Sequence, residues 1–305
     1  MWFKNLVLFR FSEPFQLLEP DLEQRLSTLD FRACGALESS TIGWVPPLGQ
    51  GVENRVHTAN GFMMLCACKE EKVLPAAVIN ETLGERILEI EQKEQRQVRR
   101  KEREGLRDEI TFELLPRALS FSRRTYGYID PRGQWLVIDA ASANTADAFT
   151  GLLRRSLGSL PIAPPRTLER PVATMTRWLS KKNCPGDLAV GSECDLRATK
   201  QEKNMVRYRG QDLFSREIDT HMDAGKECIK LGLTWNDRFS FTLDEDLNIK
   251  KLRFLDLIQE QAEDIDSDAS ADLFDAHFAI MTLELSSFLP RLLELFGGEA
   301  PQRNH

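Results

Sequence analysis

The chain has 305 residues, of which 42% are hydrophobic and 29% are charged, and its formal net charge at pH 7 is −7. This composition is ordinary for a globular protein, but the length exceeds what one simple core normally serves, so we expect two lobes or one elaborate domain. No apolar run approaches the about 20 residues that span a bilayer, and the start of the chain lacks a signal-peptide pattern, so we expect a cytoplasmic protein.

Four elements are predicted before Pro75. They are a strand over Trp2–Phe11, a helix from Glu19 to Leu26 or Leu29, a proline-containing loop over 43–49, and a strand over Phe62–Cys68 that ends in a turn at 70–72. Cys66 and Cys68 alternate within that last strand, which predicts that both lie on its buried face. The six cysteines have no CxxC or CxxH spacing, so the sequence predicts reduced core thiols and no zinc site.

A long helix is predicted from Pro75 onward. Apolar residues recur at helical spacing from Val78 to Ile90 and then give way to a charged run that ends at Arg107. About thirty residues would make a rod of roughly 45 Å, interrupted at most by Gly105. Its second half has almost no apolar face, so we expect it to project from the core, followed by a short helical piece over 108–115.

The rest of the chain predicts alternating helices and hairpins. The elements are a hairpin over 126–139 with its turn at 130–133, a helix capped by Ser142 or Asn144 that ends at Gly158, a helix over 171–180, strands over 188–190, 195–199 and 204–208, a helix over 215–225, a hairpin of 228–235 with 238–243, and helices over 254–265 and 271–296. The proline-rich stretch 160–166 is the predicted lobe boundary. We therefore expect an α/β (α+β-like) fold with antiparallel-rich sheets and packed helices. Its lobes are 1–165, which includes a projecting basic helical finger over 76–123, and 166–305, which ends in acidic helices.

Local charge suggests a surface for a polyanion. The segment 93–107 carries seven cations and three carboxylates, a net charge of +4 in an acidic chain, and further arginines follow it around apolar residues. Such residues contact phosphates without reading sequence, although a charged helix can also be a solvated face, and Phe121 can equally pack in the core. The candidate DNA-binding residues are Lys93, Arg96, Arg99, Arg100, Lys101, Arg103, Arg107, Arg117, Leu119, Phe121, Arg123, Arg124, Arg207, Arg209 and Gln211.

The C-terminal part of the chain is acidic and offers no predicted catalytic or metal site. The segment 244–299 holds fourteen carboxylates and four cations, a net charge of −10. Carboxylates over 264–275 approach a calcium-loop pattern, but Ala269 stands where that loop requires glycine, so we predict an acidic connector instead. No nucleophile-elbow, Walker or dinucleotide motif occurs, and the four histidines are isolated. We therefore predict no enzyme activity and no cofactor.

Several short motifs, in order along the whole chain, resemble one bacterial family. They are Trp2-Phe-Lys-Asn-Leu, Gly43-Trp-Val-Pro-Pro, Ala59-Asn-Gly, Lys69-Glu-Glu-Lys, Leu74-Pro, Leu114-Leu-Pro-Arg-Ala, Arg155-Ser-Leu-Gly-Ser-Leu-Pro, Gln211-Asp-Leu, Ala224-Gly-Lys, Glu263-Asp-Ile-Asp and Gly297-Gly-Glu-Ala. On these residues the chain resembles the recombination-associated proteins of the RdgC family. Two positions depart from the family pattern: Leu119 stands where relatives have an aromatic residue, and Arg209-Gly210 precedes Gln211 where relatives have lysine.

The resemblance implies both an architecture and a function. It implies a nucleoid-associated, ring-shaped homodimer whose basic hole encircles double-stranded DNA without sequence preference. It also implies that the protein restrains recombination promoted by the RecA recombinase by competing for DNA, with no membrane partner. An alternative is a protein-interaction module that binds the recombinase or another partner directly, with DNA contact incidental. A nuclease is disfavoured because the catalytic motifs are missing.

Overall fold

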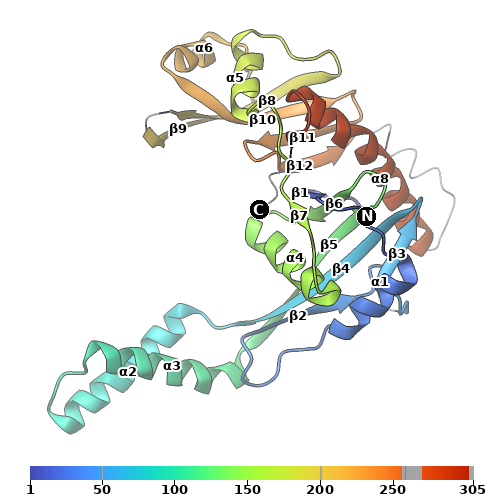
Figure 1. The fold of residues 1–305 in the computed structure, drawn as a ribbon. Coiled ribbons are helices and arrows are strands. Elements are labelled where there is room, and N and C mark those ends of the chain that lie inside the picture. The colour runs from blue at the N-terminus through green and yellow to red at the C-terminus, as the bar shows by residue number, and fades with distance from the viewer. Residues whose placement is uncertain (50, 200, 256–257, 259–269, 302–305) are drawn as a thin grey trace.

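A twelve-stranded antiparallel sheet runs through the computed structural model, which describes residues 1–49, 51–199, 201–255, 258 and 270–301 (Figure 1). The strands are β1 (Leu6–Phe11), β2 (Ser40–Val45), β3 (Val56–Ala59), β4 (Phe62–Val73), β5 (Leu119–Asp130), β6 (Trp135–Asp139), β7 (Ile162–Ala163), β8 (Leu188–Ala198), β9 (Gln201–Arg209), β10 (Lys226–Trp235), β11 (Phe239–Asp244) and β12 (Ile249–Phe254). Their order is β2-β4-β5-β6-β1-β12-β11-β10-β8-β9, with β3 on β4 and β7 on β1.

Seven α-helices lie within the described residues. They are α1 (Glu19–Leu26), α2 (Ala76–Glu94), α3 (Arg100–Leu114), α4 (Ala143–Leu157), α5 (Pro171–Ser180), α6 (Arg216–Asp223) and α8 (Ser270–Leu295), with single 3-10 turns at Ser27–Leu29 and Leu115–Arg117. The fold is therefore the mixed α/β fold that the sequence predicted, with one large antiparallel sheet.

Two hydrophobic clusters stabilise the sheet. The smaller one packs α1 and α4 against β2–β6, with Trp44 and Phe149 in edge-to-face contact at 5.3 Å between ring centroids. The larger one packs α5 and α8 on the strands, and Tyr128 of β5 meets Phe278 of α8 at 6.1 Å. The predicted boundary at 160–166 falls between α4 and α5, yet the sheet and the larger cluster continue across it. The division into lobes at residues 165 and 166 stays a prediction.

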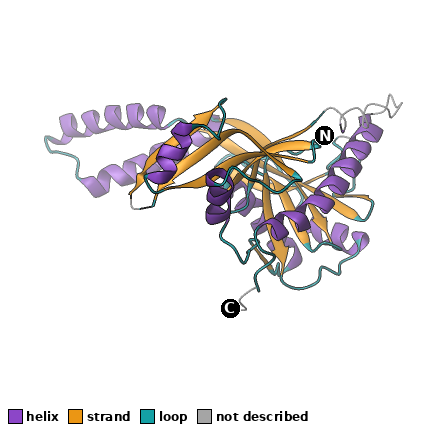
Figure 2. Cartoon of the chain, turned by 90° about the horizontal axis from the view of Figure 1, so that it is seen from above, coloured by secondary structure: helices purple, strands orange, loops and turns teal. Residues whose placement is uncertain are grey.

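The predicted single rod is wrong, because the chain reverses at its middle. Helix α2 ends at Glu94, and its C-cap Gln95 adopts a left-handed conformation with φ of 54°. Helix α3 begins after Arg99 and runs back along α2. Gly105 lies inside α3 and does not interrupt it. The two helices form a hairpin that projects away from the sheet, as Figures 1 and 2 show. At 1.5 Å per residue, the 19 residues of α2 make a helix about 28 Å long. We call residues 76–114 the helical hairpin.

Strand boundaries account for most of the other corrections. Strand β4 continues to Val73, through the predicted turn at 70–72, because β5 pairs with it along its whole length as far as Leu119. Strand β2 includes Gly43 and Trp44, which were predicted to be loop. Residues 188–198 form one strand, not two, and β12 takes the place of the predicted helix start at Phe254. The remainder of that helix prediction falls largely outside the described residues.

Elements with strong local signals were predicted correctly. Helix α4 has Ser142 as its N-cap and Gly158 as its C-cap, and α5 has the predicted bounds. In the turn between β10 and β11, Asn236 and Asp237 have φ of 45° and 54°, left-handed values that asparagine and aspartate tolerate, and Trp235 pairs with Phe239 across the three-residue loop.

Candidate nucleic-acid interface

The predicted cations of 93–107 gather at the tip of the helical hairpin. Two of them form ion pairs: Arg96 binds both oxygens of Glu102 at 2.7 Å and Glu94 at 2.6 Å, and Arg100 lies 3.2 Å from Glu104. The other five are exposed and form no direct ion pair within the described part of the chain; they are Lys93, Arg99, Lys101, Arg103 and Arg107. The tip therefore presents a dense group of solvated positive charges.

Internal contacts shape the turn at this tip. The hydrogen bond from Arg96 lowers the pKa of the Glu102 carboxyl, which keeps that carboxylate charged and paired. Glu91 accepts a hydrogen bond from the backbone N–H of Val98 at 3.0 Å. Arg96 and Glu91 thus hold the link between α2 and α3, and the charge of Arg96 is already neutralised within the protein.

The part of the hairpin nearest the sheet is acidic. Residues 76–92 and 108–116, which we call the shaft, carry seven carboxylates and one cation, a net charge of −6; these are Glu81, Glu85, Glu89, Glu91, Asp108, Glu109, Glu113 and Arg86. Because α2 and α3 run antiparallel, the two acidic stretches lie side by side, and Arg86 of α2 pairs with Glu113 of α3 at 3.1 Å. Positive charge is therefore confined to the tip and does not extend along the hairpin.

A second group of predicted residues lies where the hairpin joins the sheet. Arg117 is exposed in the turn after α3, and Leu119 and Phe121 on β5 are 79% and 54% exposed. Phe121 is therefore not a core residue, and the guanidinium of Arg123 lies 5.8 Å from its ring centroid. Arg124 points to the opposite face of β5, where a hydrogen bond with Tyr126 raises the pKa of the guanidinium.

The remaining predicted residues lie on the other end of the sheet. Arg207 and Arg209 project from β9, the strand farthest from β2 in the sheet order. Both are ion-paired with β8: Arg209 lies 3.1 Å from Glu193 and 3.4 Å from Asp195, and Arg207 lies 3.7 Å from Asp195. Gln211 follows β9 and donates its backbone N–H to the carbonyl of Ser192.

The structure therefore places the predicted residues in two regions, the helical hairpin together with its base on β5, and β9. In Figure 1 the helical hairpin and β9 project toward the same side of the molecule from opposite ends of the curved sheet. The carboxylates that pair with the β9 arginines were not predicted from the sequence. The signal was present, since Glu193 and Asp195 alternate as Arg207 and Arg209 do, but the register of β8 on β9 could not be read from it.

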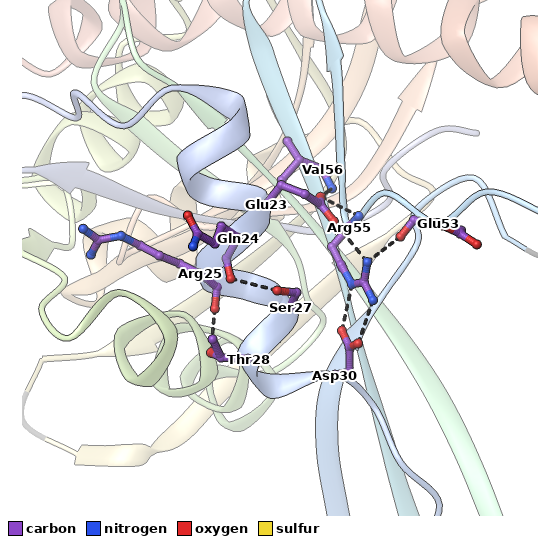
Figure 3. Close-up of polar contacts among 9 residues, drawn as sticks. All are labelled: Glu23, Gln24, Arg25, Ser27, Thr28, Asp30, Glu53, Arg55 and Val56. Carbon is purple, nitrogen blue, oxygen red and sulfur yellow. Dashed lines mark hydrogen bonds and ion pairs between the residues drawn. The ribbon is translucent and has the colours of Figure 1, made fainter.

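A further polar cluster lies beside α1 (Figure 3). Arg55 donates two hydrogen bonds to Asp30, at 2.7 and 2.6 Å, and one to Glu23 at 3.2 Å. Glu23 also accepts the backbone N–H groups of Arg55 and Val56, and the pairing raises the pKa of Arg55. These contacts fasten α1 to the start of β3, and both carboxylates serve as acceptors for Arg55.

Neither a metal-ligand cluster nor a membrane span stands out in the described parts of the chain. Among these residues, no three His, Cys, Asp or Glu side chains are grouped as a metal site would require. None of the described helices combines the length and the apolar character that a bilayer crossing needs.

Comparison with known proteins gives matches over nearly the whole chain. A family model described as "Putative exonuclease, RdgC" matches residues 1–299. The recombination-associated protein RdgC of Halorhodospira halophila is 45% identical over 299 residues, which cover 98% of this chain and 99% of that protein. The protein of the same name from Tolumonas auensis matches equally, and that of Yersinia pestis is 40% identical over 301 residues with the same coverage. The similarity thus includes the helical hairpin and both ends of the sheet.

Proposed function

The chain belongs to the RdgC family of recombination-associated proteins, and from that premise we propose that it binds duplex DNA without sequence preference. The observation that carries the proposal is the tip of the helical hairpin, which projects from the sheet and bears five exposed cations that form no direct ion pair with any described residue. Lysine and arginine side chains on such a projection contact phosphates, which every DNA sequence shares.

The same proposal includes a ring-shaped homodimer around the duplex. Its support is the placement of the two cation groups, at the hairpin and on β9, toward one side of the molecule (Figure 1). A second copy related by a two-fold axis would close the open side if the ends of the two molecules met. Duplex held in that ring is less available to a recombinase filament, so the protein restrains RecA-dependent recombination by occlusion.

Salt dependence of DNA affinity tests the phosphate contacts. Binding of a duplex oligonucleotide, followed by fluorescence anisotropy from 50 to 300 mM salt, should give a logarithmic slope of several units. The double variant Lys101→Glu/Arg103→Glu should weaken binding by at least about tenfold and reduce the slope by about two units. Lys4→Glu/Arg253→Glu changes the net charge equally at two exposed positions away from the hairpin and is the matched control. A flat salt response, or equal losses in the two variants, would contradict the proposal.

The acidic shaft favours a second candidate function, a contact with another protein. Leu88 of α2 and Phe112 of α3 are 59% and 57% exposed in the shaft, among carboxylates that repel DNA. Exposed apolar side chains within a charged rim are typical of protein contacts. A recombinase or another protein could bind there directly. DNA affinity measured with purified protein and no partner separates the two functions, because only the first predicts tight binding.

We propose that this activity involves no catalysis. The description of the family model mentions an exonuclease, whereas the names of the relatives do not. The residues that carry the proposal are arginines and lysines that attract phosphate, with no nucleophile or general base among them. End-labelled duplex incubated with the protein and Mg²⁺ or Mn²⁺ should keep its full length. Progressive shortening of the label, absent from a mock purification, would identify a nuclease instead.

A further inference from the structure

A cavity of about 220 Å³ lies between α4 and one face of β2, β4 and β5. It is separate from the tip of the helical hairpin, where the proposed contacts with DNA lie. Ile42, Lys69 and Arg123 come from three adjacent strands, and the strand register places them in one row across the sheet. The first turns of α4 form the opposite wall, with Asn144 and Thr145 among the lining residues.

Two positive charges face each other in this cavity. Lys69 and Arg123 are directly opposite in the register of β4 on β5, an arrangement of like charges that destabilises a sheet. Glu71 compensates only one of them, since it pairs with Lys69 at 2.5 Å. Arg123 forms no ion pair with a carboxylate within the described residues, and its guanidinium lies 5.8 Å from the centroid of the Phe121 ring. The cavity therefore holds an excess positive charge.

The floor of the cavity carries the side-chain hydroxyl of Thr125. Thr125 is 9% exposed and lines the cavity, because it follows Arg123 on the same face of β5. Its side-chain hydroxyl makes no hydrogen bond within the described part of the protein and remains accessible from the cavity. A ligand oxygen in the cavity can therefore accept a hydrogen bond from it without displacing a protein partner.

The helix on the opposite wall adds to the positive potential. Helix α4 spans 15 residues, and Ser142 caps its N-terminal end by accepting a hydrogen bond from the Thr145 N–H. Asn144 and Thr145, in the first turn, both line the cavity. The N-terminal end of a helix carries a partial positive charge and stabilises anions.

We propose that this cavity binds a phosphate group, either as inorganic phosphate or as the phosphate monoester at the end of a DNA strand. The ammonium of Lys69 and the guanidinium of Arg123 donate charge-assisted hydrogen bonds to its oxygens, and the hydroxyl of Thr125 donates a third. The anion then separates the two like charges and accepts a hydrogen bond from the Thr125 hydroxyl. This site is independent of the DNA contacts at the tip of the hairpin.

Isothermal titration calorimetry of the full chain with inorganic phosphate, in a chloride buffer of low ionic strength, tests the site. The isosteric variant Thr125→Val should weaken binding about fivefold, and Lys69→Gln about tenfold or more. Thr234→Val and Lys230→Gln make the same changes on β10, outside the cavity, and should leave the affinity within twofold. No binding at 10 mM phosphate, or equal affinity in Thr125→Val and the wild type, would overturn the proposal.

Two duplexes that differ only in the 5′ end distinguish the sources of the phosphate. If the group belongs to a DNA end, a 5′-phosphorylated duplex binds more tightly than its 5′-hydroxyl counterpart, and Lys69→Gln removes the difference. If the ligand is the free ion, both duplexes bind alike, and inorganic phosphate still binds. Failure of the general DNA proposal shows in the tip variants, whereas failure of this site shows in Thr125→Val, so the two outcomes are distinguishable.

Discussion

At the scale of single residues, the number of cations in a segment does not equal the charge it presents to a ligand. Arg96 and Arg100 lie in the same run as Arg103, yet their charges are used within the helical hairpin. Arg207 and Arg209 likewise form ion pairs with carboxylates of β8. Surface ion pairs are weak, so these side chains can exchange partners when a phosphate arrives, but each exchange reduces the gain in affinity.

The carboxylate of Asp195 offers a way to measure that competition. Its Oδ1 atom lies 3.4 Å from Arg209 without hydrogen-bond geometry, so the interaction is an ion pair only. If the β9 arginines contact DNA, Asp195→Asn should raise the affinity for duplex about two- to fivefold at low salt, because it removes a competing negative charge. Asp187→Asn, which removes an arginine-paired carboxylate elsewhere, is the matched control. Equal affinities in both variants would place β9 outside the interface.

The buried cysteines allow a test of burial itself. Desolvation raises the pKa of the Cys66 thiol to about 12, so at pH 8 only about one molecule in ten thousand carries the reactive thiolate there. Iodoacetamide at pH 8 should therefore label the partly exposed Cys34 well before Cys66, as measured by mass spectrometry of peptides. Because the pKa of the Cys66 thiol is higher in the folded state than in the unfolded state, the free energy of unfolding should fall as pH rises above about 8.5. Equal labelling rates in the native protein would contradict the buried position of Cys66.

At the scale of elements, the helical hairpin depends on α3, which contains a helix-weakening residue. Gly105 lies within α3, and a Cβ atom added there would meet nothing within 4 Å. Gly105→Ala should therefore stabilise α3 by about 0.5–1 kcal/mol without changing the charge of the tip. Hydrogen exchange of the α3 amides measures the effect.

Gly127 is the contrasting position in the same test. A Cβ there would come within 2.8 Å of the Phe149 ring and 3.1 Å of the Val137 carbonyl oxygen. Gly127→Ala should therefore destabilise the protein by about 1–3 kcal/mol, as measured by urea denaturation. For Gly105→Ala, hydrogen exchange of the α3 amides that is faster than in the wild type would contradict a helical conformation at Gly105.

The elements also show which features a sequence can and cannot predict. Proline at the start of α5 and the Asn236-Asp237 turn are local signals, and both predictions were confirmed. The reversal at Gln95 was missed because neither glycine nor proline marks it. Strand β12 was missed because Lys250 and Lys251 interrupt the alternation of a strand.

For the candidate interface, the positions of the cations could be predicted from the sequence, but their ion pairs and cross-strand neighbours could not. The run of cations over 93–107 was evident in the sequence, but its gathering at a tip depends on the reversal at Gln95, which was not predicted. The opposition of Lys69 and Arg123, and the pairing of Arg209 with Glu193, depend on strand register. Register is set by the packing of the whole sheet, which no local pattern specifies.

At the scale of the whole molecule, one curved sheet carries both groups of cations. The hairpin leaves β4 and β5 near one end of the strand order, and β9 forms the other end (Figure 1). The strands between them pack on α5 and α8 in one cluster, so the two groups are held at a fixed separation. In the proposed ring, two copies would meet at both ends of this sheet and leave a passage between them.

Enclosure of the duplex is a topological property and can be tested as one. Protein bound to closed circular duplex is treated with a lysine-reactive crosslinker and then with 1 M NaCl, which shortens the Debye length to about 3 Å and weakens phosphate contacts. Covalently closed dimers should remain on the circle in 1 M salt and should leave when a restriction enzyme cuts it, as measured by sedimentation. Uncrosslinked protein, which should dissociate from both forms in 1 M salt, is the control. Crosslinked dimers that leave an intact circle would show that the dimer grips DNA from one side, because only a closed ring prevents escape after the electrostatic attraction has been screened.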